Sequence, residues 1–524
     1  MYKNATRALA VAVGLALAAG ACTDLTTEPK SEVTEANVFN EPGSYRAFLA
    51  KLYGGLALSG QEGPAGAGDI RGIDEGFSQY VRLLWQMQEL PTDEAVIAWN
   101  DAGVQELNTQ LWGSSNQFLV SMYYRVFFQV SLANQFLRET TDQKLASRGV
   151  TGTLAEEIRQ YRAEARFLRA LSYWHGIDLF GDIPLVTEAD ALGNVPPKQS
   201  TRVEVYNFIV QELNEIRPQL PAAHTGQYGR ADQAAASMLL AKLYLNSGVY
   251  TGTNRFAEAR GAAEAVIGGG YSLDPNFRRI FSADNHTSPE IIFPVPQDGL
   301  KTQSYGGTTF LTHASVGGNM AASDYGLDFG WGGLRVKPEV VALFPGTAGP
   351  DKRAIFHTSG QTVAINNILN FQDGLAAPKY RNVTSTGAAG SNAGFPDTDY
   401  PMFRLADAYL IYAEAVLRGG GGTRAQALQY VNALRQRAYG DASGNIVDAQ
   451  LTLDFILDER ARELMWEGHR RTDLIRYNRF TTAGVWAFKG GVKAGKVTEA
   501  FRNLFPLPAS ELLANPNLKQ NPGY

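Results

Sequence analysis

The sequence predicts a mostly α-helical protein in which a helical scaffold carries one long insertion of loops. Apolar residues recur at helical spacing from about residue 45 to 270, and again from about 400 to 477. Between them, residues 271–399 are rich in Gly, Ser, Thr, Asn and Pro, which favour turns and loops. The chain has 524 residues, 44% of them hydrophobic, so it can bury a large core. We therefore expect a helical region at 36–270, a loop-rich ligand-binding region at 271–399 and a second helical region at 400–524.

The first residues have the features of an export signal. Two basic residues precede an apolar run of Ala, Val and Leu that is too short for a comfortable membrane span. The run ends at Gly-Ala-Cys22, which resembles a bacterial lipobox, although Ala19 stands where leucine is usual. Cys22 is the only cysteine of the sequence. We expect residues 1–21 to be a signal peptide, Cys22 to carry lipid and residues 22–35 to form a polar tether; the alternative is a plain secreted protein.

Three further elements have clear limits in the sequence. Apolar spacing predicts a helix from Leu154 to about Leu179, which the following Gly and Pro residues end. A second helix is predicted from Val203 to Ile216, where Arg-Pro closes it. Within the loop-rich region, the apolar run 291–295 predicts a short strand.

Small residues at regular positions predict two helix pairs. Residues 236–245 form an Ala- and Leu-rich helical segment, and a turn containing Gly separates it from a second helix that opens at Phe256. Residues 405–414 and the helix beginning at Ala425 repeat this arrangement around a glycine-rich turn. Small residues where helices cross, with Leu and Tyr between them, resemble tetratricopeptide-type helix pairs. Generic amphipathic hairpins are the alternative.

Composition and motifs argue against several classes of function. The net charge of −5 provides no basic field for nucleic acid. The sequence contains no HExxH pair, GxSxG elbow, phosphate-binding loop or dinucleotide-binding fingerprint. Oxygen-bearing residues alternate at Asp441, Ser443 and Asn445, but the glycine and the distal glutamate of a calcium loop are missing. We expect neither a metal nor a cofactor.

The densest charged segment allows two interpretations. Glu459, Glu463 and Glu467 are spaced to share one helix face, close to His469. Two carboxylates and a histidine are compatible with the acid–base site of a glycoside hydrolase. Because arginines alternate with the glutamates, we favour a buried network of ion pairs with the neighbouring apolar residues in the core.

Three sequence blocks resemble the SusD/RagB family. The first is the charged segment, which reads DERARELMWEGHRRTDLIR at residues 458–476. The second is the end of the chain, from Leu504 to Tyr524, and the third combines residues 163–170 with residues 180–185. Together with the lipobox, these short blocks are spaced along nearly the whole length of the chain.

The resemblance implies a lipoprotein on the outer face of a bacterial outer membrane. Its fold would be a helical scaffold with tetratricopeptide units and a loop-rich face for the ligand. Its partner would be a SusC-like TonB-dependent transporter, a barrel on which the lipoprotein sits as a lid. The usual cargo of the family is oligosaccharide, and some members take peptides. We expect a binding protein rather than an enzyme; a surface glycoside hydrolase that uses Glu463 or Glu467 is the alternative from another class.

Two segments resemble the binding loops of the family. Trp99, Asn100 and Asp101 follow the first segment, residues 89–95, and Trp331 lies among glycines in the second, residues 329–335. Tyr305 stands in a further loop with glycines beside it. Sugars bind on aromatic faces and form hydrogen bonds to amides and carboxylates, so we expect these five side chains to bind the ligand. The alternative is that each ring packs its loop onto the scaffold.

The glycines around Trp331 predict that a flat ligand can approach its indole ring. Asp328 and Arg335 are close to it in sequence, and we expect both to form hydrogen bonds to ligand hydroxyls. A ring that serves as such a platform lies outside the core, so its loss should weaken binding without unfolding the protein.

Overall fold

The computed structural model describes residues 39, 41–191, 193 and 195–524. The predictions for the signal peptide, for Cys22 and for the tether concern residues outside this part of the chain. Among the described residues, 39 and 41–45 belong to one unit, and those from 46 onward belong to a second, compact unit. The helix α3 (Pro42–Ala57) begins in the first unit, and all later elements lie in the second.

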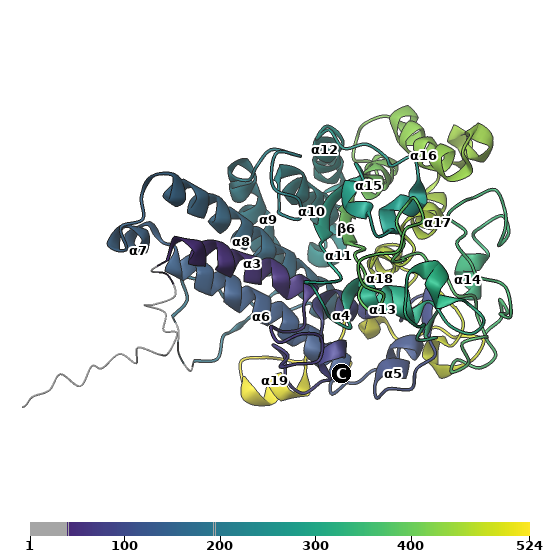
Figure 1. Ribbon diagram of the computed structural model, residues 1–524, viewed down its shortest axis with the longest axis horizontal. Coiled ribbons are helices and arrows are strands. Elements are labelled where there is room, and N and C mark those ends of the chain that lie inside the picture. Colours follow the sequence, from purple (N-terminus) through teal and green to yellow (C-terminus); the bar gives the residue numbers. More distant parts are fainter. Residues whose placement is uncertain (1–38, 40, 192, 194) are drawn as a thin grey trace, which may run out of the picture. The chain divides into compact units, whose positions relative to one another are not determined.

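Helices dominate the described part of the chain (Figure 1). The first group comprises α4 (Tyr80–Glu89), α5 (Val104–Thr109), α6 (Gln117–Glu139), α7 (Asp142–Ser147), α8 (Gly152–Phe180), α9 (Arg202–Ile216), α10 (Gln233–Leu245), α11 (Ser247–Thr251) and α12 (Phe256–Ile267). Two short helices follow, α13 (Gly307–Ala314) and α14 (Pro338–Val341). The last group comprises α15 (Leu405–Leu417), α16 (Arg424–Tyr439), α17 (Leu453–Leu464), α18 (Arg470–Arg476) and α19 (Ala509–Ala514). The prediction of a mostly helical fold is confirmed.

Strands are short and form two-stranded antiparallel sheets. The pairs are β1 (Ala95–Ile97) with β5 (Leu334–Val336), β2 (Ile183–Pro184) with β3 (Gln199–Ser200), and β4 (Ile291–Val295) with β6 (Tyr400–Arg404). The strand predicted at residues 291–295 is confirmed as β4. The β1–β5 and β4–β6 sheets join segments of the loop-rich region to the helical regions on either side of it.

The helices α8 and α9 confirm two predictions from apolar spacing. The helix predicted at residues 154–179 extends to Phe180, and it ends because Gly181 adopts a φ of 75° that favours glycine. The helix α9 begins at a capping box, in which the side chains of Thr201 and Glu204 each accept a hydrogen bond from the other's backbone N–H. Ion pairs between arginines of α8 and a glutamate of α9 hold the two helices together.

The two predicted helix pairs are present, because α10 packs against α12 and α15 packs against α16. The helix α12 also packs against α15, so the pairs form one stack in the upper part of Figure 1. Arg260 of α12 donates a hydrogen bond to the carbonyl oxygen of Gly420 at 2.9 Å, which fixes the turn between α15 and α16. The assignment of these pairs as tetratricopeptide units stays a prediction.

The glutamates of the charged segment form a buried network of ion pairs, as we expected. The helix α17 ends at Leu464, so the prediction that Glu467 shares a helix face with Glu459 and Glu463 is wrong. Glu467 instead approaches from the turn between α17 and α18. Arg404 of β6 contacts Glu463 and Glu467 at N–O distances of 2.7 and 2.6 Å.

Glu463, like Glu459, contacts three arginines of this network. Its oxygens contact Arg353 at 3.0 Å, Arg404 at 2.7 Å, and Arg437. Burial alone would raise the pKa of Glu463, but the charges of Arg437, Arg404 and Arg353 outweigh it and hold the pKa well below its usual range. Arg404 and Arg437 also contact Glu290, so the network ties β6, α16 and α17 to the segment before β4.

We expect Glu463→Gln to lower the free energy of unfolding by about 3–5 kcal/mol, because it removes a buried charge that compensates three arginines. Chemical denaturation at neutral pH measures this loss. The matched control is Glu156→Gln, which removes one partner of an exposed pair with Arg159 on α8 and should leave stability unchanged. Equal effects of the two substitutions would contradict the structural role of the network.

A second buried pair of carboxyl groups attaches α4 to the turn before α18. Glu89 accepts hydrogen bonds from the backbone N–H groups of Gly468 and His469 at 2.6 and 3.1 Å. Glu94 accepts one from the N–H of Trp466 at 3.0 Å. Burial raises the pKa of Glu94 to about 7, and burial together with the charge of Glu94 raises the pKa of Glu89 well above its usual range. Burial therefore favours the protonated form of both carboxyl groups.

This pair predicts that stability falls as the pH rises from 5 to 8. Between its ordinary pKa near 4.5 and about 7, folded Glu94 keeps a proton that the unfolded chain releases, so unfolding becomes easier with rising pH. The contribution is at most about 3 kcal/mol. We expect Glu94→Gln to reduce the difference between the melting temperatures at pH 5 and pH 8. Glu264→Gln, on the exposed face of α12, should leave that difference as in the wild type; a similar reduction in both variants would disprove the assignment.

Candidate functional site

Three of the predicted ligand-binding residues meet in one cluster of aromatic rings. The ring centroids of Trp99 and Trp331 are 6.2 Å apart, and those of Trp331 and Tyr305 are 6.3 Å apart. Tyr305 also contacts Phe395, at 5.5 Å, which the sequence did not single out. The two tryptophans are half-buried and Tyr305 is exposed. We call these four residues the aromatic platform.

The antiparallel pairing of β1 and β5 brings the two tryptophans together. The pairing continues past β1, where the N–H of Ala98 donates to the carbonyl oxygen of Gly333 at 2.9 Å. The indole N–H of Trp99 lies 3.3 Å from the carbonyl oxygen of Trp331. A Cβ at Gly333 would lie 2.6 Å from the indole ring of Trp99, so this glycine is required for the packing of Trp99. The sequence predicts only that the glycines around Trp331 let a ligand approach its ring, and it gives no sign of this packing role for Gly333.

His313 supports Trp331 and was missed in the sequence. The two rings are 4.8 Å apart with 33° between their planes, and the backbone N–H of Trp331 donates to the carbonyl oxygen of His313 at 2.8 Å. Nε2 of His313 lies 3.3 Å from a carboxylate oxygen of Asp328. Burial lowers the pKa of His313 and favours the neutral ring, which packs against the indole at little cost. No motif marks His313, because its partners lie in another segment.

Arg82 of α4 is a second residue that the sequence did not reveal. Its guanidinium donates to the carbonyl oxygen of Tyr305 at 3.0 Å, and its central carbon lies 5.7 Å from the ring of Trp99. Burial lowers the pKa of Arg82 to about 9, while the negative charge of Asp101 acts in the opposite direction. Arg82 therefore connects three of the predicted residues. The helix α4 is buried throughout, so its apolar pattern gave no sign of a functional arginine.

The other predicted polar residues differ in exposure. Asn100 and Asp328 are exposed and Asp101 is half-buried, so all three can reach a molecule at the surface. The prediction that Arg335 offers hydrogen bonds to a ligand is wrong. Its side chain is fully buried, and its guanidinium donates to three carbonyl groups within residues 368–373.

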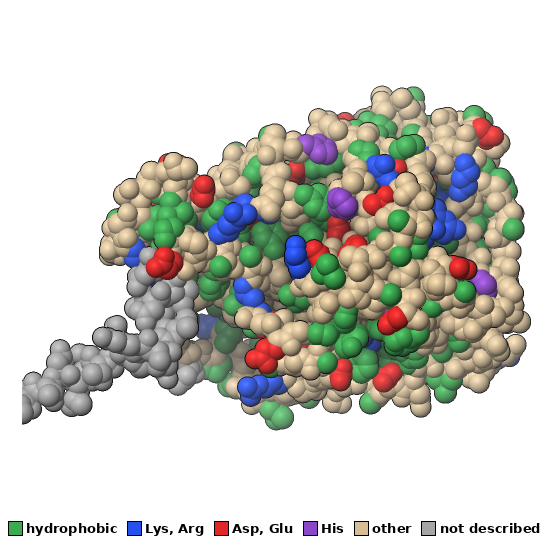
Figure 2. Space-filling view, viewed as in Figure 1, with side chains coloured by type: hydrophobic (Ala, Val, Ile, Leu, Met, Phe, Trp, Pro, Cys, Tyr) green, Lys and Arg blue, Asp and Glu red, His purple; other side chains and the backbone are tan. Residues whose placement is uncertain are grey.

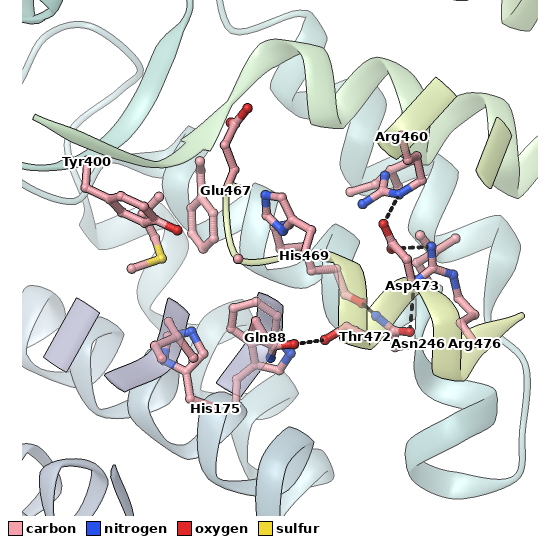
Figure 3. A pocket seen from close by; sticks show the side chains of 18 residues that line it. Gln88, His175, Asn246, Tyr400, Arg460, Glu467, His469, Thr472, Asp473 and Arg476 are labelled. Carbon is pink, nitrogen blue, oxygen red and sulfur yellow. Dashed lines mark hydrogen bonds and ion pairs between the residues drawn. The ribbon is translucent and has the colours of Figure 1, made fainter. Parts of the chain in front are cut away.

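An enclosed pocket lies among α4, α8, α10, β6 and the turn before α18 (Figure 3). Glu467 and His469 line it, but its volume of about 20 Å³ has room for about one water molecule and none for a sugar ring. Glu467 contacts Lys379 and Arg404, each at 2.6 Å. Burial lowers the pKa of His469 well below its usual range. The residues of the hydrolase interpretation therefore offer no accessible acid–base pair here.

Other classes of site find no support in the described residues. They contain no group of three or more His, Cys, Asp or Glu side chains that could hold a metal ion. None of the helices within residues 41–524 that the structure describes is long and apolar enough to cross a membrane. On the face drawn in Figure 2, acidic and basic side chains are interspersed and form no continuous basic surface. The aromatic platform thus remains the strongest candidate.

Two family models match the chain. The model described as SusD family matches residues 357–524, which include the charged segment and the end of the chain. The model described as "starch-binding associating with outer membrane" matches residues 82–245, which begin at Arg82 and include Trp99. The two matches lie on either side of most of the loop-rich region.

Curated relatives and solved structures agree with these matches. The chain is 35% identical to the starch-binding protein SusD of Bacteroides thetaiotaomicron over 91% of this chain and 92% of that protein. It is 28% identical to SusD-like protein P2 of Formosa agariphila over 80% of this chain and 83% of that protein. A solved SusD superfamily protein of B. thetaiotaomicron has a TM-score of 0.71 at 21% identity, covering 92% of this chain and 99% of that chain. Surface glycan-binding protein A of the same species, in complex with laminarihexaose, has a TM-score of 0.68 at 21% identity, covering 91% and 98%.

Proposed function

The chain belongs to the SusD/RagB family, and from this membership we propose that it is a cell-surface lipoprotein that binds nutrient oligosaccharides. It passes them to a SusC-like TonB-dependent transporter in the outer membrane. In this role the protein binds and releases its cargo without chemical change. The unavailability of Glu463 and Glu467 for acid–base chemistry supports a binding protein over the hydrolase alternative.

The aromatic platform is the observation that carries this proposal. A pyranose ring has an apolar face of C–H groups that stacks on an indole or phenol, and hydroxyls at its edge that need polar partners. Trp99, Trp331 and Tyr305 supply the rings, and Asn100 and Asp101 supply the polar groups. Stacking one sugar face on an indole removes roughly 100 Å² of apolar surface from water, worth about 2–3 kcal/mol before ordering costs.

The platform is held in place before any ligand arrives. The β1–β5 pairing fixes the backbone on both sides, His313 packs against Trp331, and Arg82 binds the carbonyl group of Tyr305. Because these side chains have little freedom to lose, the entropy cost of binding is small. Such preorganisation suits a protein that must bind moderately and release its cargo.

The relatives favour a glucan as the cargo over the peptide that other family members take. The curated relative at 35% identity is a starch-binding protein, and one solved neighbour holds laminarihexaose. Both ligands are built from neutral glucose rings, which suit aromatic platforms. The peptide alternative stays open to the same experiment, because a peptide panel can be titrated beside the glucans.

We expect the protein to bind glucans and Trp331→Ala to weaken that binding roughly ten- to a hundred-fold. The indole provides much of the stacking surface, whereas the half-buried ring contributes little to the core, so the melting temperature should hardly change. Calorimetric titration with maltoheptaose and laminarihexaose, beside peptides of similar length, measures the affinity and separates the two classes of cargo.

The matched control is Trp466→Phe, because Trp466 is fully buried in the core. It should lower the melting temperature and leave the affinity per folded molecule intact. If Trp331→Ala behaves in this way too, Trp331 only packs its loop and the platform assignment fails. Binding of peptides alone would establish the peptide alternative, and release of reducing ends from a bound glucan would establish the hydrolase.

The proposed anchor predicts that the mature chain begins at an acylated Cys22. More than one acyl chain, at about 0.8 kcal/mol for each buried methylene, anchors a protein stably. We expect the wild type to sediment with outer membranes and Cys22→Ser to be recovered in the soluble fraction. Mass spectrometry of the first mature peptide is the direct measurement; an unmodified thiol, or cleavage at another residue, would rule out the anchor.

A further inference from the structure

An open cavity lies along α6, and no residue of the aromatic platform lines it. Its volume of about 580 Å³ lies within the usual range for small-molecule sites. Four aromatic residues of α6 form one side, and Arg71 and Glu511 stand among the other lining residues. We call this cavity the α6 groove. The helix α19 runs beside α6 here, because Tyr124 and Ser510 share a hydrogen bond at 2.9 Å (Figure 1).

The rings of the groove follow from helical spacing. Tyr123, Tyr124, Phe127 and Phe128 recur at i, i+1, i+4 and i+5, which places them on one side of the helix. The rings of Tyr123 and Phe127 are 4.7 Å apart. Tyr124, Phe127 and Phe128 are only half-buried, whereas Val126, on another side of α6, is fully buried. The described chain therefore leaves part of this aromatic surface open to solvent.

Two charged side chains of the groove have no partner in the described part of the chain. Arg71 is exposed and Glu511 is half-buried, and neither side chain forms a hydrogen bond or an ion pair with described residues. Asp69, which also lines the groove, is already compensated by Lys51 at 3.0 Å and Arg125 at 3.4 Å. The groove thus offers one free guanidinium and one free carboxylate, and it has no net charge with which to select an acid or a base.

These features together specify a neutral polyhydroxylated ligand. A sugar hydroxyl can donate to the Glu511 carboxylate, and another can accept from the Arg71 guanidinium, while a C–H face lies on the phenylalanine rings. Proline-rich peptides also dock in aromatic-lined grooves, and the test below distinguishes them from carbohydrate. We propose that the α6 groove is a second site for neutral oligosaccharides, separate from the aromatic platform. This inference rests on the proposed function and adds a site to it.

The platform and the groove both adjoin the segment from Ser59 to Asp69. Ser59 shares a hydrogen bond with Ser304 at 2.9 Å, and Ser304 directly precedes Tyr305 of the platform in the sequence. Ser59 also accepts a hydrogen bond from the N–H of Asp69 at 2.9 Å, and Asp69 lines the groove. A glycan long enough to follow this segment contacts both sites, so the second contact is intramolecular and raises the overall affinity.

The test separates the two sites by substitution. In a Trp331→Ala background, in which the platform site is weakened, calorimetric titration with maltoheptaose and laminarihexaose should still show binding at the groove. Adding Arg71→Gln with Glu511→Gln should reduce the affinity of that site roughly tenfold or more, because hydrogen bonds to two charged groups are lost. In the otherwise wild-type protein, the same double substitution should leave the platform site intact. Neither charged residue has a partner to lose, so we expect the variant to fold normally.

Two further variants complete the experiment. Phe127→Ala removes a ring of the groove and should cause the same loss as the double substitution. Glu156→Gln with Arg159→Gln neutralises an exposed pair on α8 and should change nothing. Unchanged binding in all groove variants, or complete loss of binding in Trp331→Ala, would overturn the second site and leave the proposed function standing. Groove variants that lose a peptide and retain the glucans would overturn the assignment to carbohydrate. A wild-type protein that binds no glucan would overturn both proposals.

Discussion

Arg404 imposes the constraint on which the packing of the second half of the chain depends. Its buried guanidinium needs Glu290, Glu463 and Glu467 at once, at distances of 2.6–2.7 Å. A buried charge without its partners costs several kcal/mol, so partly assembled arrangements are strongly disfavoured. Only one arrangement of β4, β6, α17 and the turn after it supplies the complete set. We attribute to this network the choice of a single packing rather than a large gain in stability.

The turn between α17 and α18 also links this network to the aromatic platform. Residues 466–469 bind Glu89 and Glu94, which lie at the end of α4 and just before β1. The helix α4 carries Arg82, and β1 leads directly into Trp99. The pairing of β1 with β5 then positions Trp331. The position of the rings of the aromatic platform is therefore set by a series of contacts that runs from the core to the surface.

The sequence predicted the elements whose cause is local and missed those whose cause is not. The ends of α8 and α9 depend on glycine, proline and a capping box, all visible in the chain. The ion pairs followed from alternating Glu and Arg, but the break at Leu464 that moves Glu467 off the helix did not. Residue type and family pattern singled out Trp99, Tyr305 and Trp331, whose rings cluster in the structure; their role in binding stays a prediction. Arg82 and His313 serve the platform through carbonyl and ring contacts with distant segments, and no spacing within their own helices records this.

The stack of α12 on α15 has a consequence for how the molecule acquires its structure. The helices adjoin in space, yet the entire segment 268–404 lies between them in sequence. Bringing their ends together closes a long loop, and contacts across such separations slow the search for the native state. The strands β4, β5 and β6 all lie in that segment, and β5 pairs with β1 across a still longer separation. Because the aromatic platform depends on the pairing of β1 with β5, we expect ligand binding to report on the completely folded chain.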